Sequence, residues 1–370
     1  MNKSDLQYLD MTIKLAKKAE GKASPNPMVG AVIVKNNRII STGFHKRCGS
    51  AHAEIIALNH AGSKAKGATL YINLEPCSHF GRTAPCTEPI IKSKIKRVVI
   101  GIKDPNPLNN GKGAKRLKQA GILVELATDS KKFRELNQIF IKYITRKLPF
   151  VIVKVGQSAD GKIATSSGAS KWITNKYSRN YSHNLRNRVD AVMVGINTVL
   201  KDNPYLSCRQ GRRIKKEKPI KVIVDTKLDA PLGANIFKSS SPAPVIIATA
   251  NKSKKEKMNL LKKKGVAILV CPLDKNKNID LKFLMRELGK KEITSVLVEG
   301  GGKLIGSCFD QKLVDKAYFF IAPKIIGGKN AISSVEGIGI SSLQKAIKLD
   351  NVKLEDLKGD ILIAGDIKYS

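Results

Sequence analysis

The chain has 370 residues, which suits two domains that each bury a core of their own. Asp5 and Asp10 interrupt the stretch where a signal peptide would need an apolar run, and no uninterrupted apolar segment is long enough to cross a bilayer. Six scattered cysteines, together with the thiolate metal site described below, fit a reducing interior. We therefore expect a cytoplasmic protein with no membrane segment.

The net charge of +37 is spread over the whole chain. Residues 1–148 carry 27 Lys and Arg against 10 Asp and Glu, and residues 149–370 carry 40 against 20. Lysine supplies 53 of the 67 cations, whereas recognition of bases and paired binding of phosphates favour arginine. We expect non-specific binding to polyanions at low salt and no specific nucleic-acid partner.

Apolar strands alternate with helical stretches in the first half of the chain. A rigid turn at Ser24-Pro25-Asn26-Pro27 separates the first helix from the first strand. Alternation of this kind predicts a three-layer α/β domain. The predicted helices are 7–19, 51–61 and 87–93, and the predicted strands are 29–34, 68–73 and 97–102.

The segment 145–150 is the expected boundary, because a new strand begins at Phe150 after a short polar stretch. We place one domain in residues 1–146 and a second α/β domain, without repeat of the first, in residues 147–370. Its predicted strands are 150–155, 191–194, 220–224, 245–249, 266–270, 295–298 and 317–321.

The residues His52, Glu54, Cys77 and Cys86 indicate a catalytic zinc site. One His and two Cys can hold zinc and leave its fourth position open to water, which ionises near neutral pH. Glu54 is not needed as a ligand and can carry a proton to a leaving amine. An H-x-E motif with P-C-x-x-C is typical of zinc deaminases, but here eight residues separate the cysteines, so the match is partial. Cys86 is expected at a helix start, where the helix dipole lowers a thiol pKa.

Other interpretations remain open on the residues alone. A free Cys is often a small buried hydrophobic residue. His79 and Cys48 are rival ligands, and either one as a fourth ligand would make the site structural. The rival functions are an editing deaminase acting on RNA and a basic nucleic-acid-binding module.

A second site is predicted around Gly300-Gly301-Gly302, which follows the strand 295–298 and precedes a helix. Such a turn can cradle a phosphate on free backbone N–H groups, although no G-x-G-x-x-G is present. Trp172, the only tryptophan, lies among small polar residues, and burial in the core is its alternative role. Arg186 and Arg209 can clamp a phosphate through paired donors, with a surface salt bridge as the alternative for each.

With both sites considered, the chain resembles the bifunctional deaminase-reductase family of riboflavin biosynthesis over nearly its full length. A long insertion between the two zinc-binding cysteines is itself a mark of that family. The motifs that carry the resemblance are Pro25-Asn26-Pro27, Val29-Gly30, His52-Ala53-Glu54, Glu75-Pro76-Cys77 through Cys86, Asp104-Pro105-Asn106-Pro107, Ser158 with Asp160-Gly161, Trp172-Ile173-Thr174, Leu185-Arg186, Asp202-Asn203-Pro204, Glu299-Gly300-Gly301-Gly302 and Ala322-Pro323-Lys324.

The resemblance implies a cytidine-deaminase-like N-terminal domain and a dihydrofolate-reductase-like C-terminal domain, with zinc and NADPH as cofactors. It implies hydrolytic deamination of 2,5-diamino-6-(5-phosphoribosylamino)pyrimidin-4-one, followed by reduction of the ribosyl chain to ribityl. We expect a small-molecule substrate and a homo-oligomer. By motif match, zinc ligands are His52, Cys77 and Cys86, the proton shuttle is Glu54, reductase-substrate contacts are Ser170, Arg186, Leu206, Arg209 and Glu299, and NADPH contacts are Gly156, Trp172, Thr198, Asp202, Gly301, Gly302 and Lys303.

Overall fold

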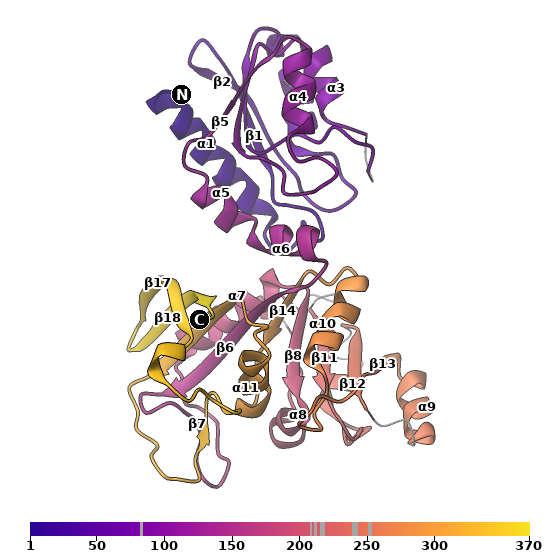
Figure 1. Ribbon diagram of the computed structural model, residues 1–370, viewed down its shortest axis with the longest axis vertical. Helices are drawn as coiled ribbons and strands as arrows, with labels where there is room; N and C mark the ends of the chain where they lie inside the picture. The colour runs from indigo at the N-terminus through magenta and orange to yellow at the C-terminus, as the bar shows by residue number, and fades with distance from the viewer. Residues whose placement is uncertain (82–83, 208, 211–212, 215–218, 239–242, 251–253) are drawn as a thin grey trace. The chain divides into compact units, whose positions relative to one another are not determined.

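The computed structural model describes residues 1–370 apart from 82–83, 208, 211–212, 215–218, 239–242 and 251–253. Within 208–218 it describes only the backbone of two short strands, β9 (Arg209–Gln210) and β10 (Arg213–Ile214). The chain divides into two compact units, Met1–Lys147 and Leu148–Ser370. Each unit contains a large β-sheet of its own (Figure 1).

The first unit is built on a five-stranded sheet with the order β2-β1-β3-β4-β5. β1 runs antiparallel to both β2 and β3, whereas β3, β4 and β5 are parallel. The parallel strands β3 and β4 are buried almost throughout, as continuous apolar runs covered on both faces should be. The strand bounds are β1 Gly30–Lys35, β2 Arg38–Phe44, β3 Thr69–Leu74, β4 Arg97–Ile102 and β5 Leu123–Leu126.

Helices cover both faces of this sheet, which confirms the predicted three-layer arrangement (Figure 1). A Cβ at Gly30 would collide with Thr12 of α1, and one at Gly43 would collide with Ala53 of α2, so both helices approach the sheet closely. The helix bounds are α1 Lys3–Ala16, α2 Ala53–Ala61, α3 Thr87–Lys92, α4 Lys112–Gln119, α5 Lys131–Leu136 and α6 Gln138–Arg146, and the short 3-10 helices are Lys17–Ala19 and Gly62–Ala65.

Two differences from the predicted elements have clear local causes. α1 begins at Lys3 because Asn2 and Asp5 form a capping box at its start. β2, which was not predicted, follows a tight turn in which Asn36 and Asn37 both have positive φ. β2 is the edge strand and half-exposed, so its sequence lacks the apolar run that marks its neighbours.

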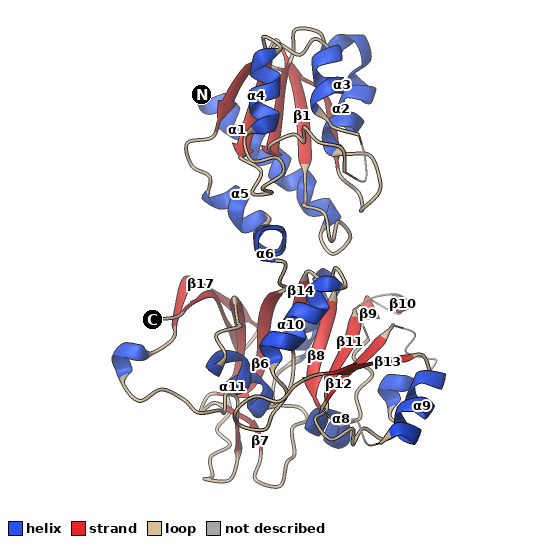
Figure 2. Cartoon of the chain, turned by 45° about the vertical axis from the view of Figure 1, so that its right-hand side comes forward, coloured by secondary structure: helices blue, strands red, loops and turns tan. Residues whose placement is uncertain are grey.

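The second unit contains a nine-stranded sheet with the order β13-β12-β11-β8-β14-β6-β15-β18-β17. The first seven strands of this order, from β13 at the edge to β15, are parallel to one another. β18 and β17 extend the sheet as an antiparallel hairpin (Figure 2). The bounds are β6 Phe150–Ser158, β7 Lys162–Ala164, β8 Ala191–Gly195, β11 Ile220–Val224, β12 Val245–Thr249, β13 Val266–Val270, β14 Ser295–Val298, β15 Lys316–Ala322, β16 Ile332–Ser333, β17 Lys348–Leu357 and β18 Asp360–Lys368.

Each predicted strand of this half is present, and β11 to β14 have the predicted limits. The hairpin β17–β18 was not predicted, although Lys358 and Gly359 at its turn both have positive φ. One core joins the sheet to α10 and α11, and α7 packs on the other face through Tyr181 against Phe320. The helix bounds are α7 Lys176–Arg188, α8 Ile196–Asp202, α9 Lys255–Lys263, α10 Leu281–Lys290 and α11 Gly302–Asp310, with 3-10 helices at Asn235–Phe237 and Leu343–Lys345. Among the helices of the described residues, none combines the length and apolar character that crossing a membrane requires.

Candidate functional site

The first unit brings His52, Cys77 and Cys86 together. His52 is the N-cap residue of α2, Cys86 is the N-cap residue of α3, and Cys77 lies in the loop that follows β3. His52 Nδ1 lies 3.1 Å from Cys86 Sγ and 3.7 Å from Cys77 Sγ. All three ligand atoms are within 4.8 Å of one another, which is the spacing of ligands around a single metal ion.

Glu54 lies beside this cluster in the first turn of α2 and is only 3% exposed. Its Oε2 has no hydrogen-bond partner, which is costly for a buried carboxyl oxygen. Burial raises the pKa of Glu54 to about 7, although the nearby His52 acts in the opposite direction. The site therefore holds a carboxyl group that is not a ligand in the cluster and whose Oε2 receives no hydrogen bond from the protein.

The two thiols differ in their hydrogen bonds and in the direction of their pKa shifts. Hydrogen bonds from Cys86 lower the pKa of Cys77 to about 4, and the Cys86 N–H donates to Cys77 Sγ at 3.3 Å. The pKa of Cys86 is raised instead, because it shares its proton with Cys77 and is buried beside Glu54. The position of Cys86 at the start of α3 is confirmed, and the lowering of its thiol pKa by the helix dipole stays a prediction.

The donor set fits zinc, since two thiolates and one imidazole are ligands that zinc prefers. Neither rival ligand belongs to the cluster found among the described residues. Cys48 directs its thiol toward Asn26 Oδ1 at 3.8 Å, and His79 lies on the loop between the cysteines. The described residues provide three ligands, so the fourth-ligand interpretation of a closed structural site is not supported.

His45 is a neighbour of the cluster that the sequence reasoning missed. It is 2% exposed and meets the His52 ring edge-on, with 5.3 Å between ring centroids. Its Nδ1 lies 3.2 Å from Ala51 O and its Nε2 lies 3.1 Å from Asn26 Nδ2, which favours a proton on Nδ1. Asn26, which contacts His45, belongs to the Pro25-Asn26-Pro27 motif, so this motif was the signal in the sequence that could have indicated His45.

In the second unit, a cavity of about 610 Å³ gathers most of the predicted reductase residues. It opens beyond the carboxyl ends of β6, β8 and β14, which are neighbouring strands, and Figure 1 shows α8 and α11 starting at that edge. Ligands commonly bind at this edge of a parallel sheet. The predicted residues that line it are Gly156, Ser170, Trp172, Arg186, Thr198, Asp202, Glu299, Gly301, Gly302 and Lys303.

One end of the cavity holds a buried ion pair. Arg186 donates from Nε and Nη2 to both carboxylate oxygens of Glu299, at 2.6 and 2.8 Å, and from Nη1 to Ser207 O at 3.3 Å. Burial works against the ionised form of Glu299, but Arg186, together with Lys154 and His183, outweighs it, and the pKa of Glu299 lies below its usual value. The paired donors of Arg186 are therefore directed to a carboxylate, and the ion pair is largely buried rather than at the surface.

The glycine turn forms a closely packed cradle. A Cβ at Gly300 would lie 2.7 Å from Thr198 Oγ1, and Gly301 has φ +73 at the N-cap of α11. A Cβ at Gly302 would collide with Ser333 O. Side chains are excluded here, so a ligand can approach the backbone at the start of α11. The cavity walls contain six Lys and Arg residues against three Asp and Glu, which suits an anionic ligand.

Trp172 lies on the wall of this cavity and is 66% exposed, so the alternative that it belongs to the core is wrong. Arg179 stacks on its ring at 4.4 Å. Of the other two predicted residues, Leu206 is buried and is not among the lining residues, and the side chain of Arg209 lies outside the described part of the chain.

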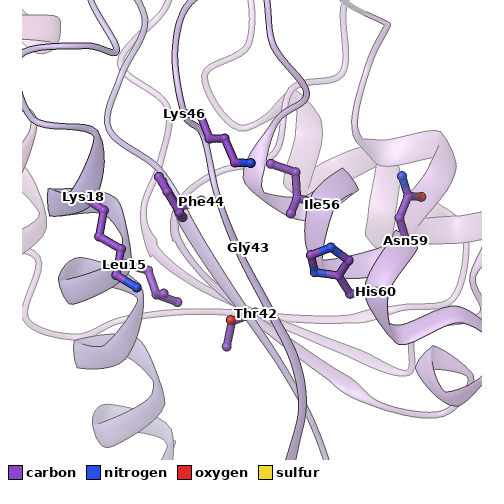
Figure 3. Close-up of a pocket in the computed structure, with 9 residues that line it drawn as sticks. All are labelled: Leu15, Lys18, Thr42, Gly43, Phe44, Lys46, Ile56, Asn59 and His60. Carbon is purple, nitrogen blue, oxygen red and sulfur yellow. The ribbon is translucent and has the colours of Figure 1, made fainter.

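The first unit has a further cavity of about 450 Å³ between α1, β2 and α2. Figure 3 shows Lys18, Phe44, Lys46 and His60 around it. None of its lining residues belongs to the predicted sites.

Two family models match the chain in the same order as its two units. Residues 2–102 match the cytidine and deoxycytidylate deaminase zinc-binding region, and residues 149–363 match the RibD C-terminal domain. Together with the cluster and the cavity, these matches define an enzyme with a zinc-binding deaminase domain and an NADPH-using reductase domain. The predicted fold class and both cofactors are thereby confirmed.

Full-length relatives place the chain more closely. It is 44% identical to the riboflavin biosynthesis protein RibD of Aquifex aeolicus, over 97% of each chain, and 37% identical to that of Escherichia coli, over 87% and 89%. A solved structure of Acinetobacter baumannii RibD is 34% identical, covers 99% of both chains and superposes with a TM-score of 0.88. A Thermotoga maritima structure described as a diaminohydroxyphosphoribosylaminopyrimidine deaminase/5-amino-6-(5-phosphoribosylamino)uracil reductase has 36% identity, 99% coverage of both chains and a TM-score of 0.84. The chain belongs to the RibD family of riboflavin biosynthesis enzymes.

Proposed function

We propose that the first unit hydrolyses the ring amino group of 2,5-diamino-6-(5-phosphoribosylamino)pyrimidin-4-one, and that the second unit reduces the ribosyl chain of the product to a ribityl chain. The buried, unsatisfied Oε2 of Glu54 beside the three-ligand cluster is the observation that carries this proposal. A carboxyl group of this kind has an acceptor atom available for a proton during the reaction.

In the deaminase unit, we assign His52, Cys77 and Cys86 as zinc ligands. Zinc in such an open site supplies a water molecule that ionises near neutral pH. Glu54 takes up a proton at its free oxygen and delivers it to the departing amine, so that ammonia leaves as a neutral molecule. Burial keeps bulk water from competing for that proton.

In the reductase unit, the cofactor NADPH supplies the hydride, and the protein positions the sugar against it. We assign Gly156, Trp172 and the turn from Gly301 to Lys303 to the cofactor, with Thr198 and Asp202 beside them. The turn and the excess of cationic walls support a ligand rich in phosphate. Ser170, Arg186 and Glu299, which line the cavity, are assigned to the substrate, and Leu206 and Arg209 are assigned to it by the motif match alone. Ser170 Oγ donates to Asp202 Oδ1 at 3.2 Å, which connects the substrate residues to the cofactor residues.

One assay of the full chain tests both halves. We expect the purified protein to release ammonia from the phosphoribosylaminopyrimidine and to oxidise NADPH once the deaminated product forms. Glu54→Gln should retain zinc and lose ammonia release by at least about a hundredfold, because general acid and base catalysis commonly contributes that much. NADPH oxidation with the deaminated pyrimidine should be unchanged in this variant and is the internal control. A Glu54→Gln protein that still deaminates would remove Glu54 from the mechanism.

We further propose that the chain acts as a homo-oligomer in the cytoplasm without a specific nucleic-acid partner. The edge strand β17 is exposed over nearly its whole length, with Val352 and Leu354 at 51% and 71% exposure, and Ile361 of β18 is 51% exposed. Exposed apolar groups on a long edge strand favour association with another chain. Leu354→Glu should shift the sedimenting species toward the monomer, whereas an unchanged mass would argue against this surface.

A further inference from the structure

The loop that carries Cys77 is held by the buried side-chain amide of Asn109, which belongs to neither of the two proposed sites. Asn109, in the segment between β4 and α4, is 0% exposed. Its Oδ1 accepts hydrogen bonds from the N–H of Ser78 at 2.9 Å and from the Ser78 hydroxyl at 2.8 Å. Its Nδ2 donates to Pro76 O and to Asp104 Oδ2, each at 3.1 Å. A single side chain thus binds the peptide groups on both sides of Cys77.

A second buried side chain fixes the start of the same loop. Glu75 is 3% exposed and accepts three backbone N–H bonds, each 2.9 Å long, from Asp104, Gly111 and Ala114. Asp104 and Gly111 belong to the segment that also carries Asn109, and Ala114 lies in the first turn of α4. The carboxylate therefore ties the residue before Pro76 to the segment on which the amide sits, and its charge is satisfied by backbone dipoles.

Close packing and one further hydrogen bond also hold the loop that carries Cys77. A Cβ at Gly113 would collide with Pro76 O, so α4 begins directly against the loop. The carbonyl of Cys77 accepts from Thr87 N at 3.2 Å, which connects the loop to the helix that begins at Cys86. The backbone around Cys77 is therefore held from both neighbouring segments.

We infer that Asn109, supported by Glu75, is a positioning residue of the metal centre. By holding Pro76 O and Ser78 N it sets where Cys77 Sγ lies relative to His52 and Cys86 before the metal binds. A thiolate on an unsupported loop would have to be ordered on binding, which weakens affinity. The inference rests on the proposed assignment of Cys77 as a zinc ligand and adds a residue outside the ligand set.

The test uses the full chain and measures the metal itself. Asn109→Ala should bind zinc about tenfold to a hundredfold more weakly in competition with a chromophoric chelator, as is usual for residues that support ligands. With Co²⁺ in place of zinc, the thiolate absorption bands should shift, because they report the ligand geometry. Asn110→Ala, which removes an exposed asparagine next in the chain, should match the parent in both measurements. NADPH-dependent reduction by the same variants checks the integrity of the second unit.

The outcomes separate this inference from the proposed ligand set. Parent-like zinc affinity and cobalt spectrum in Asn109→Ala would overturn the positioning role. Retention of zinc by Cys77→Ser with parental affinity would instead overturn the ligand assignment. Should Asn109→Ala fail to fold, Asn109→Asp keeps the volume and the acceptor for Ser78 while removing the donor to Pro76 O and to Asp104 Oδ2. The same loss of zinc affinity is expected, and parental affinity in this variant would equally overturn the positioning role.

Discussion

Single residues in both sites carry charges that the fold has removed from water. The buried carboxylate of Glu299 is stabilised in its ionised form by two cations. Arg186 binds both of its oxygens, and Lys154 Nζ lies 3.8 Å from Oε2. Burial lowers the pKa of Lys154, and Glu299 opposes that change. The geometry of this end of the cavity therefore depends on keeping all three side chains.

Arg186→Ala should destabilise the second unit by about 3 kcal/mol, because it leaves a buried carboxylate without its main partner. Urea unfolding of the full chain, followed by a probe in that unit, measures the change. Asn184→Ala on the same helix is the control, since that side chain is exposed. Equal unfolding midpoints for the two variants would show that the pair contributes little.

At the scale of elements, helix starts and strand ends position the sites. His52 and Cys86 are N-cap residues of two helices, and the loop after β3 supplies Cys77. The glycine turn likewise joins the end of β14 to the start of α11. The first helix is attached by Asp5, whose carboxylate accepts from Arg97 at 2.7 and 2.9 Å and from Tyr71 at 2.6 Å.

Asp5 gives the first unit a defined response to acid. The Arg97 hydrogen bonds hold the pKa of Asp5 well below its usual value. Its contribution to the free energy of unfolding is therefore complete above about pH 4, where the unfolded carboxyl is also ionised, and declines as the pH falls below that value. Asp5→Asn should cost about 2 kcal/mol at pH 7 and progressively less in acid.

Thermal unfolding of Asp5→Asn and of the parent from pH 7 to pH 2 measures how the difference in stability between them shrinks in acid. Asp10→Asn is the matched control on the same helix, because Asp10 is exposed and pairs with Lys132 at the surface. A constant difference between Asp5→Asn and the parent at every pH would contradict the role of the ionised carboxylate.

For the whole molecule, the two units have separate hydrophobic cores. The core of the first draws on residues between Leu9 and Phe133, and that of the second on residues between Val151 and Val314. A unit with its own core can fold alone. The domain limits that we propose, 1–146 and 147–370, differ by one residue from the division of the structure.

We expect separately produced fragments 1–147 and 148–370 to fold. The first should bind one zinc ion per chain, and the second should reduce the deaminated pyrimidine with NADPH at a rate within about tenfold of the full chain. Zinc content, circular dichroism and NADPH oxidation check this. An insoluble fragment, or one without a cooperative unfolding transition, would show that the units depend on each other.

The sequence by itself determined the two-domain α/β plan, most buried strands and the residues of the metal cluster, because continuous apolar runs and sparse His and Cys residues are local signals. It could not reveal β2 or β17, since these exposed edge strands lack such runs. β18 lies between β15 and β17 and contains the apolar run Ile361-Leu362-Ile363-Ala364, which the sequence analysis overlooked. Only the tertiary structure decided that the Cys86 N–H donates to Cys77 Sγ, that Trp172 lines a cavity and that Arg186 faces Glu299. These properties depend on partners distant in the chain, and the burial and charge that the partners impose arise only when the chain folds.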